Sequence, residues 1–249
     1  VFSVLIVEHK VYAPLFLISI FLFGCTAQQI QDTVSAVLGS SMGDPTEQEA
    51  GQGLKDALGI GITQGMGLLA KQDGFLGNDL VKIPWPNEAQ KVKDVMLNLG
   101  MQKQVDNVTT SLNRAAEKAS GVAIDVFIQV IKQMTVTDAI NIITGGNGAG
   151  TAFLKKAAAP ILTEKFRPIV NQSLGQVNAT KYWTDATSIY NKIPMVKPVN
   201  TDLTGFVTDK ALEGVFKMVE KEENKIRENP LSRTTEILKK VFGFADRKK

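Results

Sequence analysis

The sequence contains very little of the chemistry on which most enzymes and metal sites depend. Among its 249 residues there is one cysteine, Cys25, and one histidine, His9. A single cysteine cannot form a disulfide within the chain, so the fold must be held together by its core. Zinc lacks its favoured ligands, and the acidic residues show no EF-hand spacing for calcium. We therefore predict neither a metal site nor a bound cofactor.

The first 24 residues have the features of a bacterial lipoprotein signal peptide. A basic start is followed by an apolar run over residues 11–23, and Leu22-Phe23-Gly24-Cys25 matches the pattern in which the cysteine is acylated. The run is shorter than the ~20 residues of a membrane-spanning helix. We expect cleavage before Cys25 and a lipid anchor on a bacterial membrane facing the periplasm, with Thr26 favouring the outer membrane. An ordinary secretory signal or an uncleaved anchor is the alternative.

Cleavage would remove His9 and leave the mature chain without an imidazole. Ser-His-Asp and Cys-His catalysis would then be impossible, and no Ser-x-x-Lys motif is present. We predict no catalytic residues, although two carboxylates alone are enough for a hydrolase of the glycosidase type. The charge balance is mild, with 28 Lys and Arg, 25 Asp and Glu, and a net charge of +3. This excess is too small to indicate a nucleic-acid partner.

Apolar residues recur with helical spacing along most of the chain. Leu112, Ala115 and Ala119 mark one helix face, and Leu212, Val215 and Val219 mark another. No alternation of strands with helices indicates a parallel sheet. We predict an all-α bundle of about eight to ten helices, with one short extended, hairpin-like excursion near residues 74–86. One helix is predicted to begin after Thr46, and the later predicted helices are 88–99, 102–118, 120–133, 137–143, 151–175, 179–191, 203–227 and 232–242.

The domain organisation follows from this pattern. We divide the chain into a signal peptide at 1–24, a polar tether with a first helix at 25–45, a helical domain at 46–243 and a solvated basic tail at 244–249. Glycines 59, 61, 65 and 67 lie on one predicted helix, where each costs about 0.5–1 kcal/mol relative to alanine. That helix must pack closely against a neighbour or be kinked, or its glycines border a cavity for an apolar ligand.

Several motifs in a fixed order resemble those of one protein family. They are Asp73-Gly74-Phe75-Leu76-Gly77-Asn78, Leu112-Asn113-Arg114-Ala115-Ala116-Glu117-Lys118-Ala119, Thr144-Gly145-Gly146, Asp209-Lys210-Ala211-Leu212, Arg233-Thr234-Thr235 and Lys240-Val241-Phe242-Gly243. From about residue 30 to 243 the chain is similar to the bacterial domain-of-unknown-function family 4197. The resemblance implies an all-helical envelope protein and supplies no activity.

Two polar features remain to be interpreted. The glycine-rich segment 145–150 lacks the Lys-Ser/Thr ending of a phosphate loop, so we predict a turn between two helices with Thr151 as the second N-cap. Buried carboxylates need partners, and this requirement predicts a cluster that either fixes helix packing or forms the polar floor of a ligand cleft. Its candidate members are Asn113, Arg114, Glu117, Arg167, Glu222, Glu223, Arg227 and Arg233.

Trp85 lies between two prolines and is the candidate for an exposed apolar contact with a partner or membrane. We favour the alternative, in which its indole packs back over the bundle. Together these features favour a non-enzymatic, lipid-anchored envelope protein that binds or scaffolds a partner. The alternatives are a carrier of a lipid or another apolar ligand in a helical cavity, and a carboxylate-dependent hydrolase.

Overall fold

The structure, a computed structural model, describes residues 43–247 except for 177, 193–194 and 196–197. The signal peptide and the lipidation site expected at Cys25 therefore lie outside the described residues.

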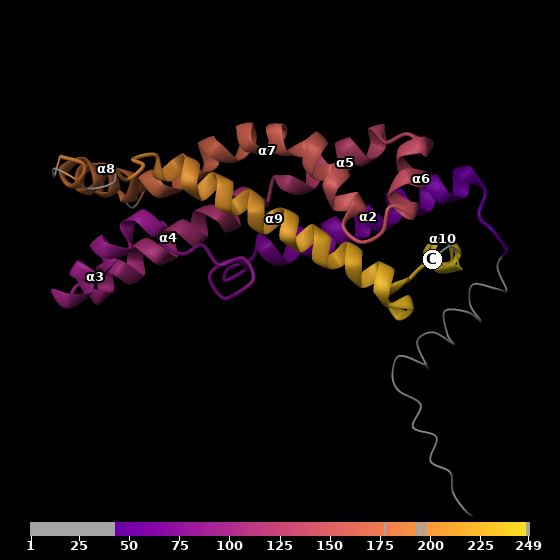
Figure 1. Ribbon diagram of the computed structural model, residues 1–249, viewed down its shortest axis with the longest axis horizontal. Helices are drawn as coiled ribbons and strands as arrows, with labels where there is room; N and C mark the ends of the chain where they lie inside the picture. Colours follow the sequence, from indigo (N-terminus) through magenta and orange to yellow (C-terminus); the bar gives the residue numbers. More distant parts are fainter. Residues whose placement is uncertain (1–42, 177, 193–194, 196–197, 248–249) are drawn as a thin grey trace, which may run out of the picture.

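Within that part of the chain the secondary structure is helical, and no β-strand is present (Figure 1). This confirms the prediction of an all-α multi-helix bundle. The elements are α2 (Glu47–Leu69), η1 (Asn87–Ala89), α3 (Gln90–Asn98), α4 (Gln102–Ser120), α5 (Ala123–Gln133), α6 (Val136–Thr144), α7 (Ala149–Gln176), α8 (Ala179–Tyr190), α9 (Leu203–Glu228), η2 (Pro230–Ser232) and α10 (Glu236–Arg247).

The long helix α9 crosses the bundle and packs against α7, α2 and α4 (Figure 1). One narrow face of helix α7 packs against this core, and every fourth residue along that face is fully buried. These residues form a stripe that consists of Leu154, Ala158, Leu162, Phe166, Val170 and Leu174. Pro160 and Pro168 lie inside α7 and each removes a backbone donor. Burial of the stripe on both sides of the prolines explains why the helix continues through them.

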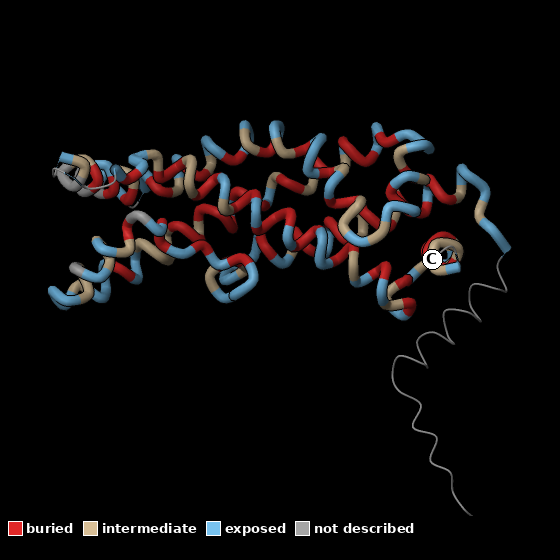
Figure 2. Tube along the Cα trace, viewed as in Figure 1, coloured by how far each residue is buried: buried red, intermediate tan, exposed pale blue. Residues whose placement is uncertain are grey.

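Helix α2 is a single helix that begins at a capping box formed by Thr46 and Glu49. Its glycines allow close packing: a Cβ on Gly53 would lie 2.7 Å from Val241 Cγ2 of α10, and one on Gly65 would lie 2.9 Å from Met218 Cγ of α9. Buried residues accordingly follow the lines along which the helices meet (Figure 2). The interior between α2, α9 and α10 is packed rather than hollow.

Residues 70–86 leave the bundle as a series of turns followed by an extended stretch. Backbone hydrogen bonds close the turns, such as the one from the Lys82 N–H to the Asn78 oxygen at 2.8 Å. The excursion is therefore present where the sequence predicts it, but its turns are not those of a β-hairpin. Phe75 and Ile83 anchor it, with exposed fractions of 0% and 1%.

The C-terminal segment differs from the prediction. Helix α10 begins at Glu236, later than expected, because residues 230–232 form the separate turn η2. It continues to Arg247, so the residues expected to form a solvated basic tail are largely helical. Asp246 pairs with Arg233 at 2.8 Å, and Arg247 pairs with Asp44 at 2.6 Å. These ion pairs hold the end of the chain against the bundle.

Candidate functional site

The carboxylate of Glu223 lies at the N-terminal turn of α7. It accepts hydrogen bonds from the backbone N–H of Gly150 at 2.9 Å, from that of Thr151 at 2.7 Å and from the Thr151 hydroxyl at 2.8 Å. Gly150 permits this approach because a Cβ there would lie 3.2 Å from the carboxylate and 3.0 Å from Leu58. The prediction of Thr151 as N-cap is therefore wrong: α7 begins at Ala149, and a side chain from α9 caps it.

Arg227 lies one turn beyond Glu223 on α9 and completes this arrangement. Its Nε donates to Glu223 at 2.9 Å, and its Nη2 donates to the carbonyl oxygen of Ile142 at 2.8 Å. The two side chains are only 3% and 4% exposed. Because an anion stabilises a helix N-terminus and a cation stabilises a C-terminus, the pair holds both the start of α7 and the end of α6.

Arg233 extends the network to α10. Its guanidinium donates to the carbonyl oxygens of Ile226 at 3.1 Å and Arg227 at 2.8 Å. Both guanidinium groups lie over the Phe242 ring, with Arg227 Cζ 5.6 Å and Arg233 Cζ 5.8 Å from its centroid. Cation–π attraction of this kind, together with the Asp246 ion pair, fastens α10 to the bundle.

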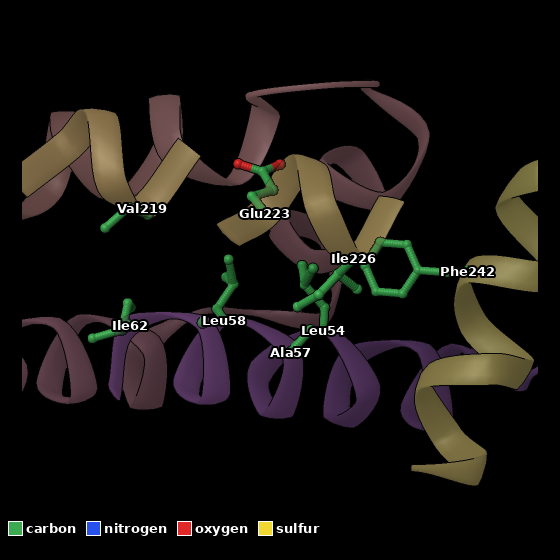
Figure 3. A pocket seen from close by; sticks show the side chains of 9 residues that line it. Leu54, Ala57, Leu58, Ile62, Val219, Glu223, Ile226 and Phe242 are labelled. Carbon is green, nitrogen blue, oxygen red and sulfur yellow. The ribbon is translucent and has the colours of Figure 1, made fainter. Parts of the chain in front are cut away.

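A small cavity lies beside this network between α2 and α9. Its volume is about 10 Å³, which is close to the lower limit for one water molecule. Figure 3 shows that apolar side chains fill the space between the two helices, while the carboxylate of Glu223 turns away from them. Those side chains are Leu54, Ala57, Leu58 and Ile62 of α2, Val219 and Ile226 of α9, and Phe242 of α10.

A second polar network joins α4 to the excursion. The side-chain amide of Asn113 accepts from the Ile83 N–H at 2.8 Å and donates to the Ile83 oxygen at 3.0 Å. Four residues later, Glu117 accepts from the N–H groups of Phe75 and Leu76 at 3.1 and 3.2 Å. Two side chains of one helix thus supply the hydrogen bonds that a neighbouring strand would supply to an extended segment.

Arg114 closes this second network at the surface. It donates to Glu117 at 2.6 Å and to Asp73 at 2.8 Å. The hydrogen bond that Arg114 donates to Glu117 is the main cause that raises the pKa of Arg114 above its ordinary value; burial opposes this effect and the bond to Asp73 adds to it. The turn that begins at Asp73 is thereby held on α4.

The predicted cluster is therefore divided rather than single. Arg167 lies apart from the others and pairs with Asp202 at 2.6 Å. Asp202 also accepts a hydrogen bond from the Gly205 N–H. This backbone bond is the main cause that lowers the pKa of Asp202, and the bond from Arg167 adds to it. Glu222 is buried against Gly61 and Gly65 of α2, and its carboxylate pairs with Lys225 at 3.3 Å. Sequence reasoning missed Asp73, Asp202 and Asp246, whose spacing gives no sign of their distant partners.

Trp85 is buried rather than exposed, with 4% of its surface accessible. Its indole N–H donates to the Thr109 hydroxyl at 3.0 Å, and its ring meets Trp183 edge-on with centroids 6.5 Å apart. The exposed contact considered for this residue is therefore not present, and the indole packs back over the bundle as the favoured interpretation expected.

Two open grooves lie on the surface. The first, which we call the α2–α5 groove, has a volume of about 770 Å³, and its main lining residues are Lys55, Gly59, Ile60, Ile128, Ile131 and Lys132. The second, the Trp85 groove, has a volume of about 630 Å³ and is lined mainly by Asp79, Lys82, Trp85, Lys93, Leu97 and Asp106. Both volumes fall in the range of ligand-binding clefts, about 300–1,000 Å³.

Within the described residues, no three or more acidic, histidine or cysteine side chains are placed to bind a metal ion together. In the same part of the chain, no single helix is both long and apolar enough to cross a membrane. One bent pair, residues 102–133 with 136–144, reaches those limits only when its two parts are combined, and it turns by 106°.

Comparison with known proteins places the chain in a family. The family model described as protein of unknown function DUF4197 matches residues 44–243. The chain belongs to this family. The matched range contains both grooves and both polar networks except for Asp246, while Arg247 and the expected lipidation site Cys25 also lie outside it. No curated protein and no solved structure matches the chain.

Proposed function

We propose that this chain is a non-enzymatic, lipid-anchored protein of the bacterial cell envelope that binds or scaffolds another macromolecule. The observation that carries the proposal is the use of its buried charged groups. Glu117 and Glu223 each accept hydrogen bonds from two backbone N–H groups and from a guanidinium. Carboxylates held in this way fix helix ends and turns, and neither faces the other across an open cleft.

The interior also favours this role over that of a carrier. A cavity for a lipid or a similar apolar ligand requires several hundred cubic ångströms, whereas the interior cavity between α2 and α9 has about 10 Å³. Of the glycines of α2 that might have bordered such a cavity, Gly61 and Gly65 instead face α9 at close range. The two surface grooves are large concave spaces that suit binding from outside.

The anchor and its address rest on the sequence at Cys25. A basic start, a short apolar run and Leu22-Phe23-Gly24-Cys25 support acylation and a position on the periplasmic face of a membrane, which we propose to be the outer membrane. The described chain begins at the end of the bundle that holds α6 and α10, far from the α3–α4 turn (Figure 1). A tether at residues 25–45 would therefore present the α3–α4 end away from the membrane.

The anchor is tested by comparing the full-length chain with its Cys25→Ser variant in a bacterial host. The unaltered chain should sediment with membranes, and its intact mass should show loss of residues 1–24 and addition of acyl chains. The variant should keep the leader and lack the acyl mass. Equal masses, or unaltered cleavage in the variant, would contradict the lipid anchor.

The binding role is tested by placing a photo-crosslinking amino acid at Gln64 in the α2–α5 groove, at Lys93 in the Trp85 groove and at the exposed Lys156 on α7. A defined partner should crosslink from at least one groove and not from position 156. Identical patterns from all three positions would contradict a specific binding surface.

A further inference from the structure

The α2–α5 groove has an apolar floor that stays accessible to solvent. Ile60 of α2 and Ile128 of α5 are half-buried, and Ile131 lies beside them. Gly59 keeps this floor open, because a Cβ at that position would meet only Ile128 Cδ1, at 3.9 Å. Unlike the glycines that face α9 and α10, Gly59 is thus not required by the packing of the bundle.

Lysines on both helices give this groove a basic rim. Lys55 on α2 and Lys132 on α5 form no ion pair with any part of the chain that the structure describes. The one carboxylate in the lining, Asp56, accepts a hydrogen bond from the Gln52 amide at 2.7 Å. An excess of positive charge therefore borders an exposed apolar surface.

The Trp85 groove does not share this charge excess. Its lysines, Lys82 and Lys93, are matched in the lining by Asp79 and Asp106. Its floor is also more completely covered, since Trp85 is 4% exposed. The two grooves therefore differ in net charge, positive in the α2–α5 groove and balanced in the Trp85 groove, and in the amount of apolar surface that they offer to a partner.

The shape of the α2–α5 groove limits what can occupy it. Its lining on α2 runs from Gln52 to Gln64, which is about 18 Å, or roughly three helical turns. Apart from Thr235, the lining belongs to helices α2 and α5, whose backbone groups are bonded internally and offer no strand edge for an added β-strand. A partner must bind through side chains, as an amphipathic helix does when residues of one face enter a groove.

We infer that the α2–α5 groove binds an amphipathic helix of a partner protein whose apolar face is flanked by acidic residues. The apolar face covers Ile60 and Ile128, and the flanking carboxylates meet Lys55 and Lys132. Opposite charges at such a rim speed association and select among partners. The inference rests on the proposed binding role and assigns to it one surface and one class of partner.

The test uses the full-length chain in detergent and two stapled, fluorescently labelled model helices. Both helices carry leucines at i, i+3, i+4 and i+7, with glutamates flanking the leucines in one and lysines in the other. Fluorescence anisotropy should show that the acidic helix binds at least about tenfold more tightly, with an affinity that falls as salt is added.

Matched variants locate the binding site. Gly59→Leu places a side chain on the groove floor and should abolish binding of the acidic helix. Gly67→Leu adds the same side chain to the same helix at a point where a Cβ meets no atom within 4 Å, and it should leave the affinity unchanged. Circular dichroism and the melting temperature show that both variants are folded.

Charge reversal provides an independent measurement. Lys55→Glu combined with Lys132→Glu should make the protein prefer the lysine-flanked helix. The same reversal at Lys82 and Lys93, in the Trp85 groove, should change neither affinity by more than about twofold.

Equal affinity for the two helices, or binding that survives Gly59→Leu, would overturn the inference. Loss of binding only on reversal of Lys82 and Lys93 would also overturn it while leaving the binding role intact, because the partner would then use the other groove. If the chain self-associates and Gly59→Leu abolishes the self-association, the groove binds a second copy instead. If it binds phosphatidylglycerol vesicles and Gly59→Leu abolishes that binding, the groove binds a lipid surface instead. Crosslinking that fails from both grooves would contradict the proposed function itself.

Discussion

Glu223 and Thr151 are 72 residues apart in the chain, yet the carboxylate of the first accepts the backbone N–H of the second at 2.7 Å. The same oxygen accepts the Thr151 hydroxyl at 2.8 Å. The place that an external anion would occupy at the N-terminus of a helix is thus filled by a side chain of the protein. This contact explains why a glycine lies at the start of α7 although the segment after α6 has no phosphate-loop motif. Gly150 allows the side chain of Glu223 on α9 to come close to the backbone.

Removing the charge of Glu223 should destabilise the fold strongly. Glu223→Gln leaves Arg227 buried without its counter-charge, and we expect the free energy of unfolding to fall by about 3–5 kcal/mol. Arg227→Met should have a similar effect, and the double variant should lose less than the sum of the two. Urea denaturation measures all three. As a control, Glu213→Gln removes an exposed partner of Lys210 and should cost about 1 kcal/mol or less. Additive losses would contradict the coupling.

Asn113 should hold the excursion through its amide rather than through its volume. Asn113→Asp keeps the shape but replaces the donor to the Ile83 oxygen with a second acceptor, so we expect a loss of about 1–3 kcal/mol. Hydrogen exchange of the Ile83 amide should accelerate more than that of α7. Asn107→Asp, at an exposed position of the same helix, serves as the control. Unchanged exchange at Ile83 would show that the excursion is held by its apolar residues alone.

The glycines of α2 should respond to substitution with opposite signs. Gly67→Ala adds a methyl group in open space and should stabilise the protein by about 0.5–1 kcal/mol. Gly53→Ala places a Cβ 2.7 Å from Val241 Cγ2 and 3.1 Å from Ile237 Cγ1, and this overpacking should cost about 1–3 kcal/mol. Melting temperatures of the two variants give the comparison. A stabilising Gly53→Ala would contradict the close packing of α2 against α10.

Acid should weaken the contact between α10 and the start of α2. The hydrogen bond from Lys240, with further bonds from Thr46, lowers the pKa of Glu49 from 4.5 to about 2. Because the folded state lowers this pKa, the contribution of Glu49 to stability is complete above pH 4.5 and is lost as the pH falls toward 2. Urea midpoints of the unaltered chain should therefore fall more between pH 5 and pH 2 than those of Glu49→Gln.

The matching control is Glu47→Gln in the first turn of the same helix, where the carboxylate forms no ion pair with the described residues. This variant should follow the unaltered chain over the same pH range. Parallel pH curves for Glu49→Gln and the unaltered chain would show that Lys240 does not stabilise the folded state through Glu49.

Local signals were enough to predict most helices. The range expected at 203–227 is observed as Leu203–Glu228, and that expected at 179–191 as Ala179–Tyr190. The capping box at Thr46 and Glu49 is confirmed. Errors occurred where a helix boundary depends on a distant residue: α7 begins before Thr151 because Glu223 caps it, and α10 is displaced because Arg233 and Asp246 hold its flanks.

The sequence by itself determined that this chain forms a multi-helix bundle, because helical periodicity and capping depend on residues within a few positions of one another. It also predicted that Glu222 or Glu223 borders the apolar face of its helix and needs a partner, since the apolar stripe of that helix passes through these positions. Only the tertiary structure decided which groups those charges meet and where grooves stay open. Hydrogen bonds such as that from Arg227 to Ile142, across 85 residues, form only when the packing of whole helices brings their ends together.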